Sequence, residues 1–127
     1  MGRYVAILPH MKTDTNRQYE LATLKAEILK ALAHPTRLLM VEALAKGERC
    51  VCELNELVPA DHSTISKHLS ILKKAGILSD RKEGLKVFYR LETPCVLQFM
   101  GCVVSAISSR TQKELSLLRS GMKNAGV

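Results

Sequence analysis

Two cysteines separated by a single valine, Cys50 and Cys52, are the residues whose spacing most directly suggests chemistry in this chain. Thiolates are the ligands that trivalent arsenic and soft divalent metals prefer. Residues i and i+2 of a regular helix point about 200° apart around the axis, so the two thiols can bind one ion only if Cys50 precedes the helix or its first turn deforms. Two alternatives stay open. Either Cys52 fills the core and Cys50 is incidental, or the pair forms a disulfide, which we expect least because its ring would be small and strained.

The other two cysteines, Cys95 and Cys102, are seven residues apart. On a helix they would share a face about 10.5 Å apart, which is too far for one ion within one chain. We expect them to be small hydrophobic residues of a dimer-forming helix, because free cysteine is commonly buried. In the alternative, they meet thiols of a second copy of the chain, or Cys95 or Cys102 is the third ligand of the Cys50/Cys52 site.

The histidines form no catalytic pattern. His34 precedes a proline and is expected in a turn. His68 borders an apolar stripe, where a histidine more often packs and hydrogen-bonds than binds a metal. His62 precedes the helical stretch that follows it and could touch DNA. No Ser-His-Asp order, Gly-rich phosphate loop or carboxylate pair stands out. We therefore expect that the chain is not an enzyme.

Charge points to an anionic partner. The 127 residues fit one domain and carry a formal net charge of +7, with a pI near 9.4. Between Lys67 and Arg90 there are seven basic residues and two acidic ones. A basic surface this concentrated on a small domain favours nucleic acid as the partner.

The elements that must position these residues follow from periodicity and from glycine and proline positions. Helices are predicted within residues 15–33, 35–47, 51–58, 61–76 and 93–120, the last as one helix or two. The alternation of Val87, Tyr89 and Leu91 with Lys86, Phe88 and Arg90 predicts a strand, and Glu83-Gly84 is the expected turn of a hairpin. The fold class is therefore mainly α with a β-hairpin wing: a winged helix-turn-helix that forms a homodimer.

The helix over 61–76 is the expected DNA-binding element. Ile65, Leu69 and Leu72 form its inward stripe, and its other face carries hydroxyls and lysines without a carboxylate. Such a face can approach phosphates and base edges. The expected DNA contacts are His62, Ser63, Thr64, Ser66, Lys67 and His68 on the helix and Arg81, Lys82 and Lys86 on the hairpin.

Apolar residues around the last helix as far as Ile107 exceed what one amphipathic stripe requires, so we expect burial against a second copy. The expected dimer interface consists of Leu21, Leu24, Ile28, Val96, Phe99, Met100, Val103 and Ile107. The expected organisation is an N-terminal arm over residues 1–13, a DNA-binding and dimerisation domain over 14–120, and a flexible tail over 121–127. His10-Met11 resembles a cloning junction, which leaves open whether residues 1–10 are native.

Three stretches, "LAHPTRLLMVEALAKGE", "STISKHLSILKKAGIL" and "RKEGLKVFYRL", resemble the ArsR/SmtB family of metal-sensing bacterial repressors. The resemblance runs from about Ala22 to Ile107. The segment "CVCEL" is similar to the arsenite-responsive branch, whose members often have a third cysteine where this chain has Asn55. Cadmium and lead sensors usually add cysteines in an N-terminal arm, and none precedes Cys50. Zinc and nickel sensors use Asp and His on the last helix, which contains no Asp, Glu or His around residues 97–110.

The resemblance implies a homodimeric repressor that binds operator DNA without a cofactor and releases it when arsenite or antimonite binds Cys50 and Cys52. A cadmium- or lead-responsive repressor of the same fold is the alternative. A zinc-stabilised interaction module without DNA affinity is a more distant one. The sequence has no run of about eighteen apolar residues and no signal-peptide pattern. We therefore expect no membrane partner and a reducing cytoplasm, where free thiols are favoured over structural disulfides.

Overall fold

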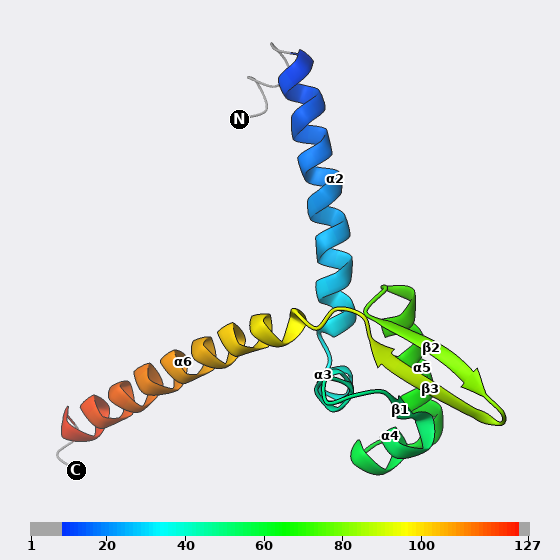
Figure 1. Cartoon of the computed structure of the whole chain (residues 1–127). Helices are drawn as coiled ribbons and strands as arrows, with labels where there is room; N and C mark the ends of the chain where they lie inside the picture. The colour runs from blue at the N-terminus through cyan, green and yellow to red at the C-terminus, as the bar shows by residue number, and fades with distance from the viewer. Residues whose placement is uncertain (1–8, 125–127) are drawn as a thin grey trace. The chain divides into compact units, whose positions relative to one another are not determined.

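The computed structural model describes the backbone of residues 9–124 and the side chains of residues 14–121. Its elements follow the order α2 (Pro9–Leu32), α3 (Pro35–Leu44), β1 (Arg49–Cys50), α4 (Val51–Leu57), α5 (His62–Lys74), β2 (Leu78–Glu83), β3 (Lys86–Leu91) and α6 (Val96–Asn124) (Figure 1). The chain divides into two compact units, one up to Glu92 and the other from Thr93. Among residues 9–124, no helix combines the length and the apolarity needed to cross a membrane.

The predicted helices are confirmed, with shifted ends. α2 begins at Pro9, inside the expected arm, and α6 is one helix that continues to Asn124, into the expected tail. Residues 1–8 and 125–127 of the expected arm and tail lie outside the described part of the chain. Asp61 is the N-cap of α5, and its side chain accepts a hydrogen bond from the Thr64 amide. An oxygen at this position satisfies an amide that has no partner within the helix.

The sheet of the first unit has three antiparallel strands in the order β1-β3-β2. The hairpin β2–β3 is confirmed, and we call it the wing, but the expected Glu83-Gly84 turn is wrong by one residue. Glu83 pairs with Lys86, so Gly84 and Leu85 form the two-residue turn. Gly84 has a φ of 62°, which suits the first position of a II′ turn, a position that glycine adopts without steric cost. The third strand, β1, is absent from the sequence-based prediction because two residues carry no periodicity.

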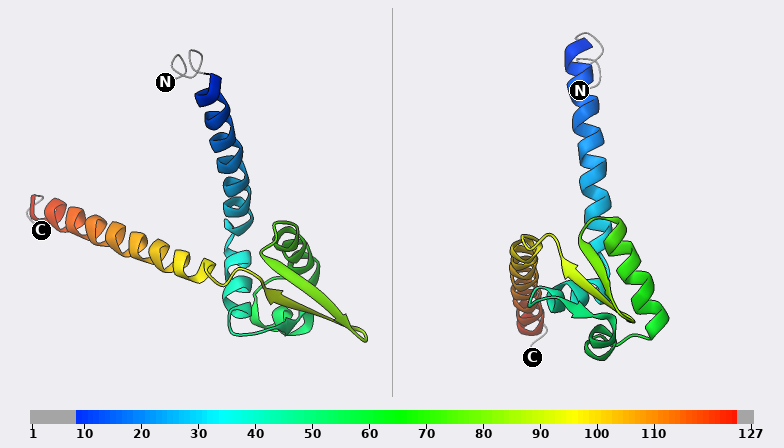
Figure 2. Two further views of the ribbon diagram at one scale, coloured as in Figure 1. Left: turned by 45° about the horizontal axis from the view of Figure 1, so that its top comes forward. Right: turned by 45° about the vertical axis from the view of Figure 1, so that its right-hand side comes forward.

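The core of the first unit lies between α3, α4, α5 and the start of β2. The expected inward stripe of α5 is confirmed, since Ile65, Leu69 and Leu72 are each at most 1% exposed. Figure 2 shows from two sides that α5 lies beside the wing. The other buried side chains are mostly aliphatic, as the absence of tryptophan requires: Met40, Val41, Leu44, Leu54, Ile77 and Leu78.

One polar group, His68 of α5, belongs to this core and is 8% exposed. Its Nδ1 lies 2.9 Å from Nη1 of Arg37 in α3. Arginine only donates, so His68 Nδ1 accepts and the neutral ring carries its proton on Nε2. The ring of His34, the N-cap of α3, lies 4.3 Å from the His68 ring, centroid to centroid. The buried histidine therefore fixes the orientation of α5 against α3.

We expect the free energy of unfolding to fall as the pH is lowered through the ordinary histidine pKa of 6.5. Burial, followed by the charges of His34 and Arg37, lowers the pKa of His68. The unfolded chain then binds a proton at a pH where the folded chain does not, so acid favours unfolding until the pH falls below the folded-state pKa. His68→Gln keeps an acceptor for Arg37 and should flatten the dependence between pH 7.5 and 5. Denaturant melts at several pH values measure this for His68→Gln and for the exposed control His62→Gln. If the free energy of unfolding of His68→Gln depends on pH as that of the wild type does, His68 is not the cause.

Candidate thiol site and nucleic-acid interface

Cys50 and Cys52 lie at the junction of β1 and α4. Cys50 is the last residue of β1, where it pairs with Phe88 of β3. It is also the N-cap of α4, with extended backbone angles of φ −76° and ψ 159°. Cys50 thus precedes the helix, which is the condition under which both thiols can reach one ion. Cys50 is buried and Cys52 is exposed.

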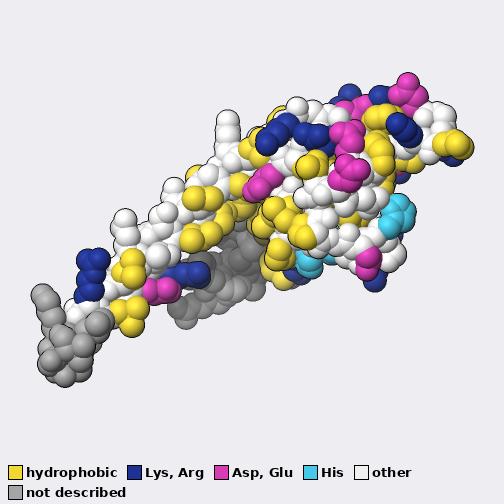
Figure 3. Space-filling model, turned by 90° about the horizontal axis from the view of Figure 1, so that it is seen from below, with side chains coloured by type: hydrophobic (Ala, Val, Ile, Leu, Met, Phe, Trp, Pro, Cys, Tyr) yellow, Lys and Arg dark blue, Asp and Glu magenta, His cyan; other side chains and the backbone are white. Residues whose placement is uncertain are grey.

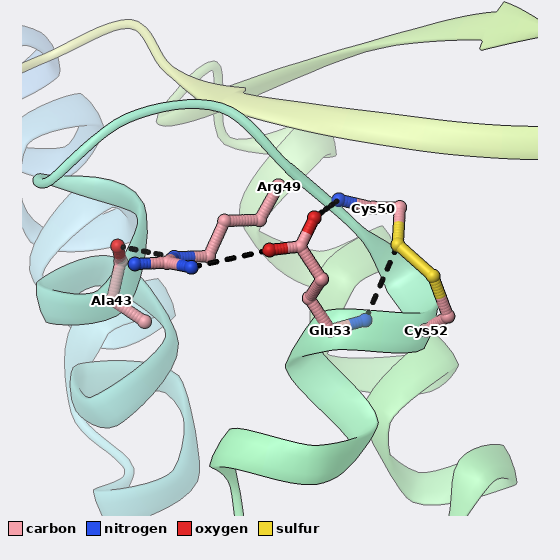
Figure 4. A network of polar contacts seen from close by, with 5 residues as sticks. All are labelled: Ala43, Arg49, Cys50, Cys52 and Glu53. Carbon is pink, nitrogen blue, oxygen red and sulfur yellow. Dashed lines mark hydrogen bonds and ion pairs between the residues drawn. A yellow bond between two sulfur atoms is a disulfide. The ribbon is translucent and has the colours of Figure 1, made fainter.

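Cys50 and Glu53 form a reciprocal capping interaction at the start of α4 (Figure 4). The Glu53 amide donates to Cys50 Sγ at 3.3 Å, and the Cys50 amide donates to Glu53 Oε1 at 3.2 Å. Arg49 Nη1 lies 3.2 Å from Glu53 Oε2, and Arg49 Nε donates to the Ala43 carbonyl at 3.1 Å. These contacts tie the sulfur of Cys50 to the end of α3 as well as to α4. The pattern Cys-x-x-Glu could have revealed this capping box in the sequence, although serine or threonine is usual at its first position.

The two cysteines form a disulfide in this structure, which corrects the expectation that this pairing is the least favoured (Figure 4). The expected strain applies to two residues inside a regular helix. The extended backbone of Cys50 turns its side chain back over the first turn of α4, toward that of Cys52. The Cα atoms are 5.2 Å apart, within the usual range of about 4.4–6.8 Å. A soft ion can bind these sulfurs only after the disulfide is reduced.

A cavity of about 390 Å³ opens beside the two sulfurs. It brings the thiol pair together with three of the predicted DNA contacts, His62, Ser66 and Lys86. The remaining lining residues are Val51, Asn55, Leu85, Val87 and Tyr89. The thiol site and the candidate DNA surface therefore share one cavity. Sequence reasoning noted Asn55 only for the cysteine it replaces and did not find its pairing with His62, in which Asn55 Nδ2 lies 2.8 Å from His62 Nδ1.

The exposed face of α5 carries four of the predicted DNA contacts at its surface, His62, Ser63, Ser66 and Lys67, and Thr64 is half-buried. Asp61 Oδ1 accepts a hydrogen bond from the Thr64 amide at 2.7 Å and another from the Ser63 hydroxyl at 2.9 Å. The bonds from Thr64 and Ser63 lower the pKa of the Asp61 carboxyl. His68 lies on the buried side of the helix, in contact with α3 rather than with solvent. This placement removes His68 from the candidate DNA contacts, because its ring cannot reach a groove without leaving the core.

The three predicted contacts on the wing differ in their partners. Arg81 pairs with Glu48 and, at 2.8 Å, with Glu83, and its guanidinium lies 4.7 Å from the Phe88 ring centroid. The two carboxylates raise the pKa of Arg81, and Arg81 lowers that of Glu48. Within the described residues, Lys82 and Lys86 have no carboxylate partner. The lysines are therefore freer than Arg81 to contact phosphate.

The remaining thiols and the predicted dimer residues are accessible. Cys95 and Cys102 are free and exposed in the single chain, and their expected place in a dimer interface stays a prediction. The predicted dimer residues of α2 (Leu21, Leu24 and Ile28) are 37–57% exposed. On α6, Phe99, Val103 and Ile107 are 43–50% exposed, and Val96 and Met100 are half-buried. Figure 3 shows hydrophobic side chains along the surface of this helix. Within the described residues, no three side chains of His, Cys, Asp or Glu gather in a way that could hold a metal ion.

Comparison with known proteins identifies the family. Residues 34–80 match the family described as bacterial regulatory protein, arsR family. The chain is 40% identical over 90 residues to the arsenic resistance transcriptional regulator ArsR1 of Pseudomonas putida, with 70% of each chain covered. The chain belongs to the ArsR family. It is thus a helix-turn-helix transcriptional repressor of the ArsR/SmtB type, and since this family consists of regulators, the expectation that the chain is not an enzyme is confirmed.

Solved structures confirm the fold of this ArsR-family chain. The repressor BigR from Xylella fastidiosa has a TM-score of 0.62 and 30% sequence identity, with 72% of this chain and 94% of that chain covered. The homodimeric winged helix-turn-helix DNA-binding domain of a Mycobacterium bovis protein has a TM-score of 0.64 and 29% identity, with 76% and 90% covered. Mainly helical architecture with a β-hairpin wing is therefore confirmed.

The contribution of the Cys50 cap to the free energy of unfolding can be measured with variants of the two cysteines. In reduced protein, we expect Cys50→Ala to unfold more easily than Cys50→Ser by roughly 0.5–1 kcal/mol, because serine still accepts from the Glu53 amide. Cys52→Ala is the matched control, since Cys52 is exposed and does not cap. Thermal or urea melts of the three variants measure the difference. Equal stability of Cys50→Ala and Cys50→Ser would show that the cap contributes nothing.

Proposed function

We propose that this ArsR-family repressor responds to trivalent arsenic: arsenite or antimonite binds reduced Cys50 and Cys52, and the protein then releases its operator. The observation that carries the proposal is the position of Cys50, which caps α4 and pairs with the wing strand β3. The donor set supports it, because two adjacent thiolates suit a soft, thiophilic ion. The similarity to an arsenic resistance regulator of Pseudomonas putida supports the same inducer.

Binding begins from the reduced pair. Arsenite has three As–O bonds; each protein thiol forms one As–S bond while one As–O bond breaks, and the thiol proton leaves with the hydroxide as water. Closing both sulfurs on one arsenic atom re-aims the Cys50 sulfur away from the Glu53 amide that donates to it. The first turn of α4 loses a cap, and α4 packs against α5 and β3. Arsenic binding therefore disfavours the arrangement of α5 and the wing that binds DNA.

DNA binding is assigned to α5 and the wing. Ser63, Thr64, Ser66 and Lys67 face the major groove in this proposal, with His62 at the start of the helix. Lys82 and Lys86 contact flanking phosphates or the minor groove. Arg81 can contact DNA only after its ion pair with Glu48 or Glu83 breaks, so it contributes less to DNA binding than the two lysines do. Concentrated lysines with few internal partners supply the electrostatic attraction that operator DNA requires.

The proposed assembly is a homodimer, as in the structurally similar Mycobacterium bovis domain. The apolar side chains of α2 and α6 that are exposed in the single chain would be buried between two copies. A two-fold dimer would place its two α5 helices about 34–36 Å apart, the spacing of successive major grooves. The two copies would therefore bind a pseudo-palindromic operator.

The dimer is tested by sedimentation at micromolar concentration. We expect a single dimeric species, and Phe99→Glu should shift it to monomer because a carboxylate would be buried in an apolar interface. Leu85→Glu is the matched control, since Leu85 lies fully exposed at the wing tip. A wild-type protein that sediments only as a monomer would exclude the dimer.

The DNA-binding surface is tested by charge reversal. We expect Lys67→Glu to abolish binding to an operator selected from a random DNA pool while the thermal melt is unchanged, because Lys67 is exposed on α5. Wild-type affinity should fall by about 0.9 log units per log unit of salt for each phosphate neutralised. Lys46→Glu makes the same charge change on an exposed lysine that follows α3 and should retain most of the affinity. If the two variants bind equally well, α5 is not the recognition helix.

The inducer is tested by serine variants in parallel titrations with arsenite, cadmium and zinc. Cys50→Ser and Cys52→Ser should bind the operator and fail to release it with arsenite. Cys95→Ser and Cys102→Ser should respond nearly normally, because neither residue belongs to the α4 cap. If cadmium releases the operator at lower concentration than arsenite does, cadmium is the inducer and the proposed arsenic response is wrong. Arsenite release that persists without Cys50 and Cys52 and stops without Cys95 and Cys102 would move the sensor to α6.

A further inference from the structure

The cavity beside Cys50 and Cys52 is much larger than an ion needs. Trivalent arsenic forms three bonds, and the described residues place only two thiols together around this cavity. A hydroxide or water would complete the set in a volume of about 30 Å³. The cavity holds about 390 Å³, within the usual range of about 300–1,000 Å³ for small-molecule sites. Its size suits an organic ligand rather than a single oxygen.

The cavity walls indicate what kind of molecule fits. Val51, Leu85 and Val87 offer apolar surface next to the sulfurs. Lys86 supplies a positive charge that has no carboxylate partner among the described side chains. The walls thus combine an apolar surface with a cation.

We infer that a low-molecular-weight thiol carrying a carboxylate binds in this cavity and supplies the third sulfur to arsenic. This inference rests on the proposed arsenic response. Its carbon chain would lie against the valines and Leu85, and its carboxylate would pair with Lys86. The chemistry balances: arsenite and three thiols give three As–S bonds and three waters, and arsenic stays trivalent. No oxidant or reductant is consumed once the Cys50–Cys52 disulfide is reduced.

The inferred ligand also links binding to DNA release. Lys86 is one of the two wing lysines assigned to phosphate contacts and it lines the cavity. A carboxylate held beside Lys86 would compete with DNA phosphate for the same cation. Occupation of the cavity would therefore weaken DNA binding through the wing, in addition to the loss of the α4 cap.

The test measures arsenite affinity by equilibrium dialysis on the full chain, reduced with a phosphine and desalted without oxygen. The probes are 3-mercaptopropionate, 2-mercaptoethanol and cysteamine, which are anionic, neutral and cationic. Because these thiols also bind arsenite in solution, each affinity is divided by that of Val87→Phe, which fills the cavity, under the same conditions. We expect a wild-type advantage of at least about fivefold with mercaptopropionate, less with mercaptoethanol and none with cysteamine. Val87→Ala, which leaves the cavity open, should behave like wild type.

X-ray absorption and a second variant complete the test. With mercaptopropionate, arsenic should have three sulfur neighbours; without added thiol, it should have two sulfurs and one oxygen. Lys86→Gln should remove the advantage of the anionic over the neutral thiol, which checks the inference independently of the folding of Val87→Phe.

Two sulfurs and one oxygen in the presence of thiol would overturn the inference in favour of hydroxide. Three sulfurs without added thiol, lost in Cys95→Ser or Cys102→Ser, would overturn it in favour of a protein ligand. If arsenite does not bind Cys50 and Cys52 at all, the proposed function itself fails.

Discussion

The hydrogen bond from the Glu53 amide to the Cys50 sulfur is the interaction on which the candidate sensor depends. It exists because Cys50 ends β1 in an extended conformation and begins α4 as its N-cap. The same residue therefore fixes the start of a helix that packs on α5 and the register of a strand paired with the wing. A ligand that binds this sulfur therefore acts on both DNA-binding elements.

Electrostatics divide the basic residues into two groups. Arg81 is held by Glu48 and Glu83, and Lys73 pairs with Asp80 at 3.0 Å. These exposed pairs contribute little to stability, because water screens them, but they orient the wing and hold its cations close to the protein. Lys67, Lys82 and Lys86 have no such partners among the described side chains, so net charge alone overstates how many cations are available to DNA.

Much of this fold could be predicted from local patterns. The stripe of Ile65, Leu69 and Leu72 follows helical spacing, Asp61 is a usual cap, and Gly84 marks the hairpin turn within one residue. The cavity could not be predicted, because residues from α4, α5 and β3 meet there only in three dimensions. His68 was assigned to DNA for a related reason: its contact with Arg37, which lies 31 positions earlier in the chain, is not evident from the sequence. The disulfide was disfavoured because its ring is small, and the sequence alone does not show that the extended backbone of Cys50 lets the two side chains meet.

The free energies show why loss of the cap cannot by itself release DNA. A switch from 1:99 to 99:1 requires about 5.5 kcal/mol of differential binding. A lost N-cap supplies roughly 0.5–1 kcal/mol, so two subunits supply about 1–2 kcal/mol. The remainder must come from contacts that differ between the two states. Displacement of Lys86 from phosphate is one source, and altered packing of α4 on α5 is another. A response that reaches the wing through the shared cavity therefore agrees better with the energetics than one confined to the first turn of α4.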